Sequence, residues 1–339
     1  MATARLGEAL PSRSPRLLML PMADRQHGSS RLRAWQYIPH LERAGFEVRA
    51  VNRLELPSAA SYSLAVLRGI LWCDLVFIQK CFFPGWLLRV CRAMGRKVVY
   101  DFDDAIFLSP DGSPSPHVRR LESCLGAASC VIAGNSHLAE YARRFNSSVH
   151  ILPTPVPMSP LAPRARTPGR FVLGWIGTKS TVPDLESISE ALREASRRLP
   201  ELVLKVITAE PVKMEGVRIE FVPWKLETAE SELRSADVGI MPLRNNPFTL
   251  GKCAYKALQC MALGMPVIVT PYGISAEVVA DGREGLWASG QDEWVRAISK
   301  LHGYPETAGQ MGLAAYDRAR TFGVEPLTRR LLDVLHTGQ

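Results

Sequence analysis

Three groups of residues in this 339-residue chain have the types and the spacing to do chemistry. In the first, Gly251 precedes Lys252, Lys256 and Gln259, and the residues between them are apolar, aromatic or small. At about 100° per residue the two lysines and the glutamine share one helical stripe. A helix that begins at Gly251 would also turn free backbone N–H groups toward its start. This arrangement suits a phosphate or diphosphate, and the alternative is the solvated face of an ordinary amphipathic helix.

The second group is acidic. Asp101, Asp103 and Asp104 lie at the end of an apolar run, 97–101, that is typical of a buried strand. Carboxylates at the end of a strand are costly unless they are solvated, paired or used. They could act as a general base, bind substrate hydroxyl groups, hold a divalent cation or cap a turn. A metal is the weaker alternative, because no histidine or further carboxylate is near in the sequence.

The third group follows the first strand-like run. His27, Gly28 and Ser29 come directly before Arg31 and Arg33. A glycine lets the backbone approach a ligand closely, a serine can cap a helix, and the arginines can pair with anions. A capped helix start that binds nothing is the alternative.

Two isolated positions add to these groups. Gly177 and Lys179 follow a strand-like run at 171–176 and suit a phosphate, although the pattern of a P-loop is absent. Trp224 ends another strand-like run and could stack on a flat ring or pack in the core. The chain contains neither GxSxG nor HExxH, so hydrolase and zinc-peptidase functions have no support.

Strand-like and helix-like runs alternate along the chain, with helices expected at 30–44 and 252–263 among others. This alternation predicts an α/β fold in which helices cover both faces of parallel sheets. Six prolines among residues 153–168 interrupt the alternation and indicate a linker. The predicted parts are a disordered leader at 1–15, a Rossmann-like domain at 16–155, a linker at 156–169, a second Rossmann-like domain at 170–315, and terminal helices at 316–339 that could cross back to the first domain. A cleft between the domains, at the carboxyl ends of the strands, is the expected site.

The composition is that of a soluble globular protein, with 47% apolar and 22% charged residues. No apolar run approaches the roughly 18–20 residues needed to span a bilayer, the N-terminus lacks a secretory signal, and the seven scattered cysteines suggest reduced thiols. We therefore expect a cytoplasmic protein, with a peripheral position on the inner face of the cell membrane as an option. Residues 1–160 contain 19 Lys and Arg against 12 Asp and Glu, which favours an anionic partner such as a membrane surface or a phosphorylated substrate. No basic stripe is interleaved with aromatic residues, so nucleic acid is not expected.

Taken together, these segments resemble the GT-B glycosyltransferases, in particular the large family 4 of retaining enzymes. Gly28–Val48 is similar to the family's first loop and helix, 133–137 and 151–153 to the last strands of its first domain, and 236–243 and 259–270 to its donor-site core. The resemblance covers about residues 16–335. It implies two Rossmann-like domains that face a central cleft, and transfer of a sugar from a nucleotide-diphosphate sugar to a glycan, lipid-linked or small-molecule acceptor. It also implies retention of the anomeric configuration, with no cofactor and no bound metal.

The resemblance implies that the second domain holds the donor, with Trp224 near the base, Lys252 and Lys179 near the diphosphate, and Gln259 at the ribose hydroxyls. The other residues that we assign to donor binding are Gly28, Ser29, Gly177, Gly251, Tyr255 and Lys256. We assign acceptor binding to His27, Arg31, Arg33 and Asp101, and catalysis to Asp103, Asp104 and Lys252.

The sequence departs from the common family pattern at two places. The Glu-x7-Glu pair of the family falls on Gly251 and Gln259, and the arginine that often follows the glycine near position 177 is Thr178. In this respect the chain resembles a subset of family 4 that lacks the glutamates and has residues like Lys252, Lys256 and Gln259 of this sequence in their place. Loss of both glutamates keeps a second hypothesis open, a degenerate transferase that binds sugar nucleotides without turnover. A GT-B-like sugar-nucleotide epimerase is a third, disfavoured because it would need carboxylates at these positions.

Overall fold

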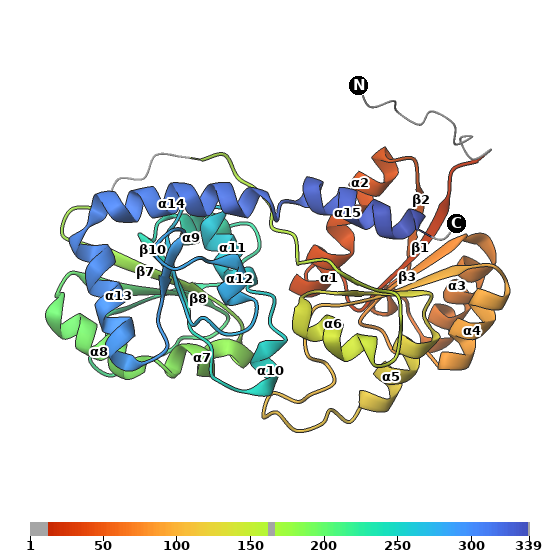
Figure 1. Ribbon diagram of the computed structural model, residues 1–339, viewed down its shortest axis with the longest axis horizontal. Helices are drawn as coiled ribbons and strands as arrows, with labels where there is room; N and C mark the ends of the chain where they lie inside the picture. Colours follow the sequence, from red (N-terminus) through yellow and green to blue (C-terminus); the bar gives the residue numbers. More distant parts are fainter. Residues whose placement is uncertain (1–12, 162–166, 338–339) are drawn as a thin grey trace.

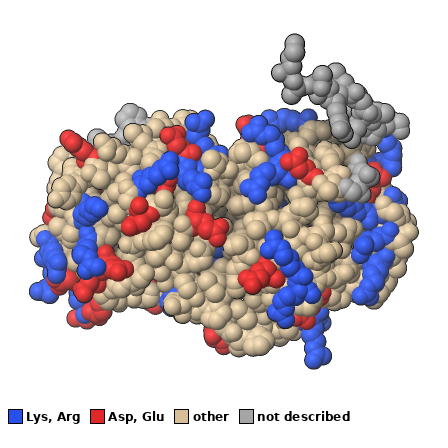
Figure 2. Space-filling view, in the orientation of Figure 1, with Lys and Arg blue, Asp and Glu red and all other residues tan. Residues whose placement is uncertain are grey.

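The computed structural model describes residues 13–161 and 167–337, which form two α/β domains side by side (Figure 1). Figure 2 shows the same view with all atoms, in which the two domains meet along the middle of the molecule. Most of the predicted leader, part of the predicted linker and the last two residues lie outside the described residues. Within the described part of the chain, no helix is long and apolar enough to cross a membrane.

The first domain is built on a parallel six-stranded sheet in the order β2-β1-β3-β4-β5-β6. Its strands are β1 (Arg16–Pro21), β2 (Glu47–Ala50), β3 (Leu75–Gln79), β4 (Lys97–Phe102), β5 (Cys130–Ala133) and β6 (Val149–Ile151). Its helical elements are α1 (Gly28–Arg33), η1 (Trp35–Tyr37), α2 (Ile38–Arg43), η2 (Arg53–Glu55), α3 (Ala59–Trp72), α4 (Gly85–Ala93), α5 (Val118–Ala127) and α6 (Ser136–Arg143), the η elements being 3-10 turns.

Both faces of this sheet are covered, as the apolar strands predict. Because side chains alternate along a strand, Leu18 and Leu20 of β1 pack in the cluster formed with α3 to α6. Leu17 and Met19 point to the other face and pack in the cluster formed with α2 and the last helix of the chain. The predicted α/β class is therefore confirmed for this half.

The second domain repeats the design with a parallel sheet in the order β12-β11-β10-β7-β8-β9. Its strands are β7 (Phe171–Ile176), β8 (Leu202–Thr208), β9 (Ile219–Pro223), β10 (Val238–Met241), β11 (Val267–Val269) and β12 (Gly285–Trp287). Its helical elements are η3 (Lys179–Thr181), α7 (Val182–Glu186), α8 (Ser189–Arg198), α9 (Ala229–Arg234), α10 (Pro247–Leu250), α11 (Tyr255–Met261), α12 (Ser275–Val278), α13 (Gln291–Gly303) and α14 (Pro305–Arg320).

The last helix, α15 (Val324–His336), returns to the first domain. Figure 1 shows α14 on the second domain and α15 continuing beyond it onto the first. Leu327 and Leu331 of α15 are fully buried in the same cluster as β1. The chain passes between the domains twice, once between β6 and β7 and once between α14 and α15. A hydrogen bond joins these two segments, from the backbone N–H of Val156 to Phe322 O at 2.9 Å.

Two expected helices differ from prediction. The helix expected at 30–44 is divided into α1, η1 and α2, because Ala34 leaves the helical region and Pro39 cannot donate the bond that would continue the helix. The helix expected at 252–263 begins only at Tyr255, since Ala254 before it has a left-handed φ of 51°.

Candidate functional site

A cavity of about 510 Å³ lies between the two domains, at the carboxyl ends of the strands of both sheets. Most of the predicted site residues line it. Those of the first domain are His27, Gly28, Ser29, Arg31, Asp103 and Asp104, and those of the second are Gly177, Lys179, Trp224, Lys252, Tyr255, Lys256 and Gln259. The structure therefore brings together residues that are more than 200 positions apart in the chain.

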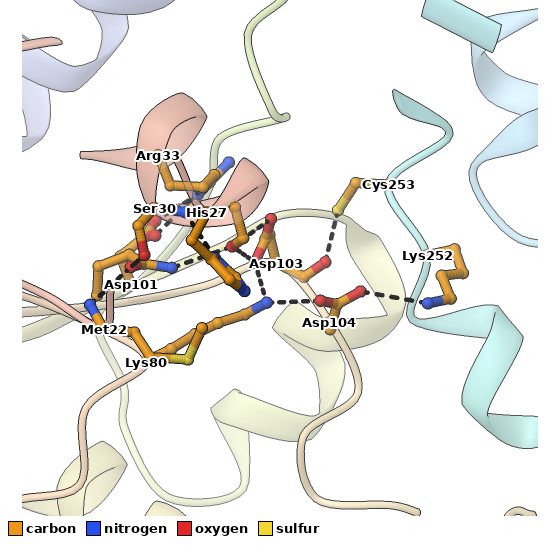
Figure 3. A network of polar contacts seen from close by, with 12 residues as sticks. Met22, His27, Ser30, Arg33, Lys80, Asp101, Asp103, Asp104, Lys252 and Cys253 are labelled. Atoms are coloured by element: carbon orange, nitrogen blue, oxygen red, sulfur yellow. Dashed lines mark hydrogen bonds and ion pairs between the residues drawn. The ribbon is translucent and has the colours of Figure 1, made fainter. Parts of the chain in front are cut away.

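The wall formed by the first domain is a continuous polar network (Figure 3). Ser29, in the first turn of α1, donates its hydroxyl to Asp103 Oδ1 at 2.9 Å. The side chain of Gln79, at the end of β3, donates to the Ser29 oxygen at 3.1 Å and accepts from Ser30 at 2.9 Å. A serine was expected to cap the start of α1, but the cap is His27, whose ring accepts a hydrogen bond from the Ser30 N–H.

Lys80 is the functional-site residue that the sequence analysis missed. It directly follows β3, has a left-handed φ of 56°, and is only 6% exposed. Its ammonium lies 2.5 Å from Asp103 Oδ1 and 2.5 Å from Asp104 Oδ2. Burial alone would lower the pKa of Lys80, but the two carboxylates outweigh it and raise that pKa. The available signal was a lysine placed directly after the strand-like run that ends at Gln79, next to the strand that ends at the aspartates.

The lysine changes what the aspartates can do. Burial tends to raise the pKa of Asp103, but Lys80, Arg33 and Ser29 together outweigh burial, and the pKa of Asp103 lies below its ordinary value. A carboxylate held as an anion by a cation and a serine hydroxyl is a weak base. Asp104 is more open, with a side chain 33% exposed, and its second oxygen lies 3.8 Å from Lys252 Nζ. Asp104 is therefore the acidic group best placed to meet a ligand.

The assignment of Arg33 and Asp101 to acceptor binding was wrong. Both side chains are fully buried and they bind one another, with Arg33 Nε donating to Asp101 Oδ2 at 3.1 Å and Nη2 to Oδ1. The remaining Nη1 donates to Leu152 O at 2.6 Å. Burial lowers the pKa of Arg33, but Asp101 outweighs it and the pKa is raised. The pair holds α1 on the sheet, and neither residue lines the cavity.

Gly251 was also interpreted incorrectly as the start of a phosphate-binding helix. It is the C-terminal cap of the one-turn helix α10, and it does not line the cavity. A Cβ at this position would lie 2.5 Å from Cβ of Ala105 in the first domain. The glycine is required for close contact between the domains, and Lys252 lies in the turn before α11, with its ammonium 4.7 Å from the Phe248 ring centre.

Short interdomain contacts fix this turn. The Cys253 thiol donates to Asp103 O at 3.1 Å, and the side chain of Asn135 donates to Lys252 O at 3.1 Å. A Cβ on Gly134 would lie 2.4 Å from Cys253 Sγ, so a larger residue would push the domains apart. These contacts place Lys252 of the second domain opposite Asp104 of the first.

Lys256 lies in the cavity wall and has no acidic partner among the described residues. Its ammonium lies 5.7 Å from the centre of the Trp175 ring, and among the described residues no carboxylate is within ion-pair distance. Burial, and then the charge of Lys252, lower its pKa to about 8. Lys179, by contrast, is 79% exposed at the rim and pairs with Glu210 at 3.1 Å. An anion that entered the cavity would therefore meet Lys256 without having to displace a carboxylate.

Trp224 and Gln259 connect this cavity to a smaller, mostly apolar hollow of about 240 Å³. The two residues line both spaces, together with Tyr255 and Arg31. Within the described residues the amide of Gln259 has no hydrogen-bond partner, so its donor and acceptor groups are free for a ligand. An indole beside an open amide suits a flat ring attached to a hydroxylated group.

The described residues contain no group of three or more His, Cys, Asp or Glu side chains arranged to hold a metal ion. The acidic cluster does not form one because Asp101 turns away to Arg33, while Asp103 and Asp104 share Lys80.

This fold and cleft define a class: the GT-B arrangement, in which two Rossmann-like domains face each other across a ligand site. Residues 170–303, which make up most of the second domain, match the family model described as glycosyl transferases group 1. Among solved structures, sucrose-phosphate synthase from Thermosynechococcus elongatus aligns with a TM-score of 0.72 at 15% identity, covering 95% of this chain and 98% of that one. HepE of Anabaena, solved in complex with UDP and glucose, aligns with a TM-score of 0.70 at 14% identity, covering 95% and 99%.

Curated relatives match over shorter stretches. The D-inositol 3-phosphate glycosyltransferase of Pseudarthrobacter chlorophenolicus is 26% identical over 227 residues, which are 58% of this chain and 53% of that protein. The enzyme of the same name from Arthrobacter sp. strain FB24 is 35% identical over 105 residues, 30% of this chain and 24% of that protein. The chain thus spans about half or less of the length of these two relatives.

Proposed function

We propose that the protein is a glycosyltransferase that moves a sugar from a nucleotide-diphosphate sugar to an acceptor hydroxyl. The observation that carries this proposal is the pair of ammonium groups, Lys252 and Lys256, on the second-domain wall of a cleft whose opposite wall carries Asp104. The match of the second domain to group 1 glycosyltransferases and the GT-B fold support it.

In this proposal the donor lies mainly against the second domain. The diphosphate lies at Lys252 and Lys256, the ribose at Gln259, and the base beside Trp224 in the smaller hollow. The acceptor and the transferred sugar lie against the first domain, near His27, Arg31 and Asp104. An acceptor that is a glycan, a lipid-linked compound or a small molecule is compatible with this arrangement.

The reaction breaks the bond between the anomeric carbon and the diphosphate oxygen and forms one to the acceptor oxygen. Negative charge then develops on the leaving diphosphate, where the two ammonium groups stabilise it in a partly desolvated site. We infer that these cations replace a bound metal in this role. Retention of the anomeric configuration is part of the proposal and rests on the family resemblance.

The first test is a thermal-shift screen of the protein against UDP, GDP, dTDP, ADP and CDP, each with Mg²⁺ and with EDTA. One diphosphate at a concentration of 100 times its Kd should stabilise the fold by about 2.7 kcal/mol. The shift should persist in EDTA. No shift with any nucleotide would contradict a preformed donor site, and a strict need for Mg²⁺ would contradict the metal-free proposal.

A second candidate function is a sugar-nucleotide binder without turnover, favoured by the amide of Gln259 where the family usually has a carboxylate. It differs from the main proposal in one measurable respect. The binder would show the same thermal shift but would release no nucleoside diphosphate from any nucleotide sugar, with or without acceptors.

The pKa of Lys256 predicts how donor binding depends on pH. Because burial and Lys252 lower this pKa to about 8, the ammonium is mostly charged at pH 7 and loses its proton as the pH rises through 8. Affinity for the nucleoside diphosphate should therefore be highest below pH 8 and decline above it. Calorimetric titrations across this range measure the effect. The Lys256→Arg variant stays charged across this range, so its affinity for the nucleoside diphosphate should not change with pH. A decline of equal size in that variant would exclude Lys256 as the cause.

A further inference from the structure

Helices α3 and α4 expose large apolar side chains on the outer surface of the first domain. On α3, Leu64, Leu67 and Leu71 are 49%, 50% and 67% exposed, and their spacing of three and four residues places them on one stripe. On α4, Trp86 and Val90 are 64% and 45% exposed and lie one turn apart. An isolated exposed leucine is ordinary, but two adjacent stripes form an apolar surface that marks an interaction site.

The two stripes belong to one surface. Both helices cover the same face of the sheet, in the cluster that also includes α5 and α6. Figure 1 places α3 and α4 next to each other at the end of the molecule away from the second domain. We call this surface the α3–α4 face.

The charged side chains of helices α3 and α4 are all positive. Arg68 of α3 and Arg89 of α4 are exposed between the apolar side chains, and neither helix contains an aspartate or glutamate. Figure 2 shows mainly blue side chains among tan surface at this end of the molecule. Where α4 ends, a hollow of about 390 Å³ continues the basic character, and its lining includes Arg92, Arg96, Lys97 and His150 but no carboxylate.

We propose that the α3–α4 face docks on an anionic lipid bilayer. Leucine and tryptophan side chains on one face of a helix enter the boundary between headgroups and acyl chains, while arginines between them pair with lipid phosphates. Juxtaposed basic residues add electrostatic attraction to an anionic leaflet. A second copy of the chain fits this face poorly, because a two-fold axis would bring arginines against arginines. The surface is separate from the cleft, and the proposal does not rest on the proposed reaction.

The test is cosedimentation of the full chain with two kinds of vesicle, phosphatidylcholine alone and phosphatidylcholine mixed with phosphatidylglycerol. Binding should be strong only with the anionic vesicles and should weaken with salt. Each basic residue at such a surface contributes about fivefold to partitioning, so Arg68→Glu with Arg89→Glu should reduce binding at least about tenfold. Leu67→Glu with Leu71→Glu should reduce binding to a similar extent through the apolar contact.

Matched controls lie on other surfaces. Leu313→Glu changes a leucine of α14 that is 54% exposed, and Arg329→Glu changes an exposed arginine of α15. Neither should alter vesicle binding. All variants should keep the melting temperature and the nucleotide-induced thermal shift of the parent protein, which separates failure of this proposal from failure of the donor site.

Three results would overturn the proposal: no binding to anionic vesicles, equal loss in the control variants, or unchanged binding in both face variants. Light scattering without lipid supplies a further check. A dimer that Leu67→Glu with Leu71→Glu dissociates would assign the face to pairing between copies instead.

Discussion

Replacement of Arg33 by Met should lower the free energy of unfolding by about 3–5 kcal/mol, as is typical when one partner of a buried ion pair is removed. The substitution leaves the fully buried Asp101 carboxylate without its cation and leaves Leu152 O without its donor. Chemical denaturation followed by circular dichroism measures the loss. Nucleotide binding by the folded fraction should be unchanged, because Arg33 does not line the cleft.

The double variant Arg33→Met with Asp101→Leu separates a structural role from a ligand-binding role. Replacing a whole buried pair by apolar residues is often neutral or stabilising, so most of the lost stability should return. An acceptor-binding pair would behave in the opposite way, with little loss of stability in the single variant and a loss of turnover that the double variant does not restore.

Replacement of Lys256 by Met should lower turnover by about 10²- to 10³-fold, the usual effect of removing one preorganised group that stabilises developing charge. The side chain keeps a similar length and apolar stem, so the main change is loss of a positive charge in the cleft. Release of nucleoside diphosphate at saturating donor, compared with release at low donor concentration, measures how much of the loss lies in binding and how much in the chemical step.

Stability should respond to Lys256→Met in the opposite direction from activity. Folding lowers the pKa of Lys256 from 10.5 to about 8, so the charged lysine lowers stability fully below pH 8, and this penalty declines as the pH rises from 8 to 10.5. The melting temperature of the variant at pH 7 should therefore equal or exceed that of the parent protein. A large fall would show that the lysine has a structural role.

Two other lysines serve as controls. Lys252→Ala should lower turnover at least tenfold, equivalent to about 1.4 kcal/mol, because Lys252 faces the same space. Lys179→Ala should have a much smaller effect, because Lys179 is exposed at the rim and already pairs with Glu210. Equal effects at all three positions would indicate a diffuse electrostatic contribution in place of the specific contacts proposed.

The sequence by itself determined the two α/β domains, the cleft and most of its lining. These features depend on local sequence patterns. Buried parallel strands are continuous apolar runs in the sequence, and the residues that follow such strands lie together at one edge of the sheet. His27, Gly177 and Trp224 all follow strands, and all three line the cavity. The α/β alternation and the proline-rich segment were therefore enough to place them.

Only the tertiary structure decided which charged residues face the cleft and which bind one another. Arg33 meets Asp101 across 68 positions, and Cys253 meets the backbone of Asp103 across 150 positions. Nothing local distinguishes Asp101 from Asp104, because the choice depends on which sheet face the neighbouring helices cover and on how closely the second domain approaches. The same packing gives Gly251 its contact with Ala105 and places Lys80 between two carboxylates. A buried charge needs a partner at hydrogen-bond distance, and that partner is supplied by the packing of distant segments.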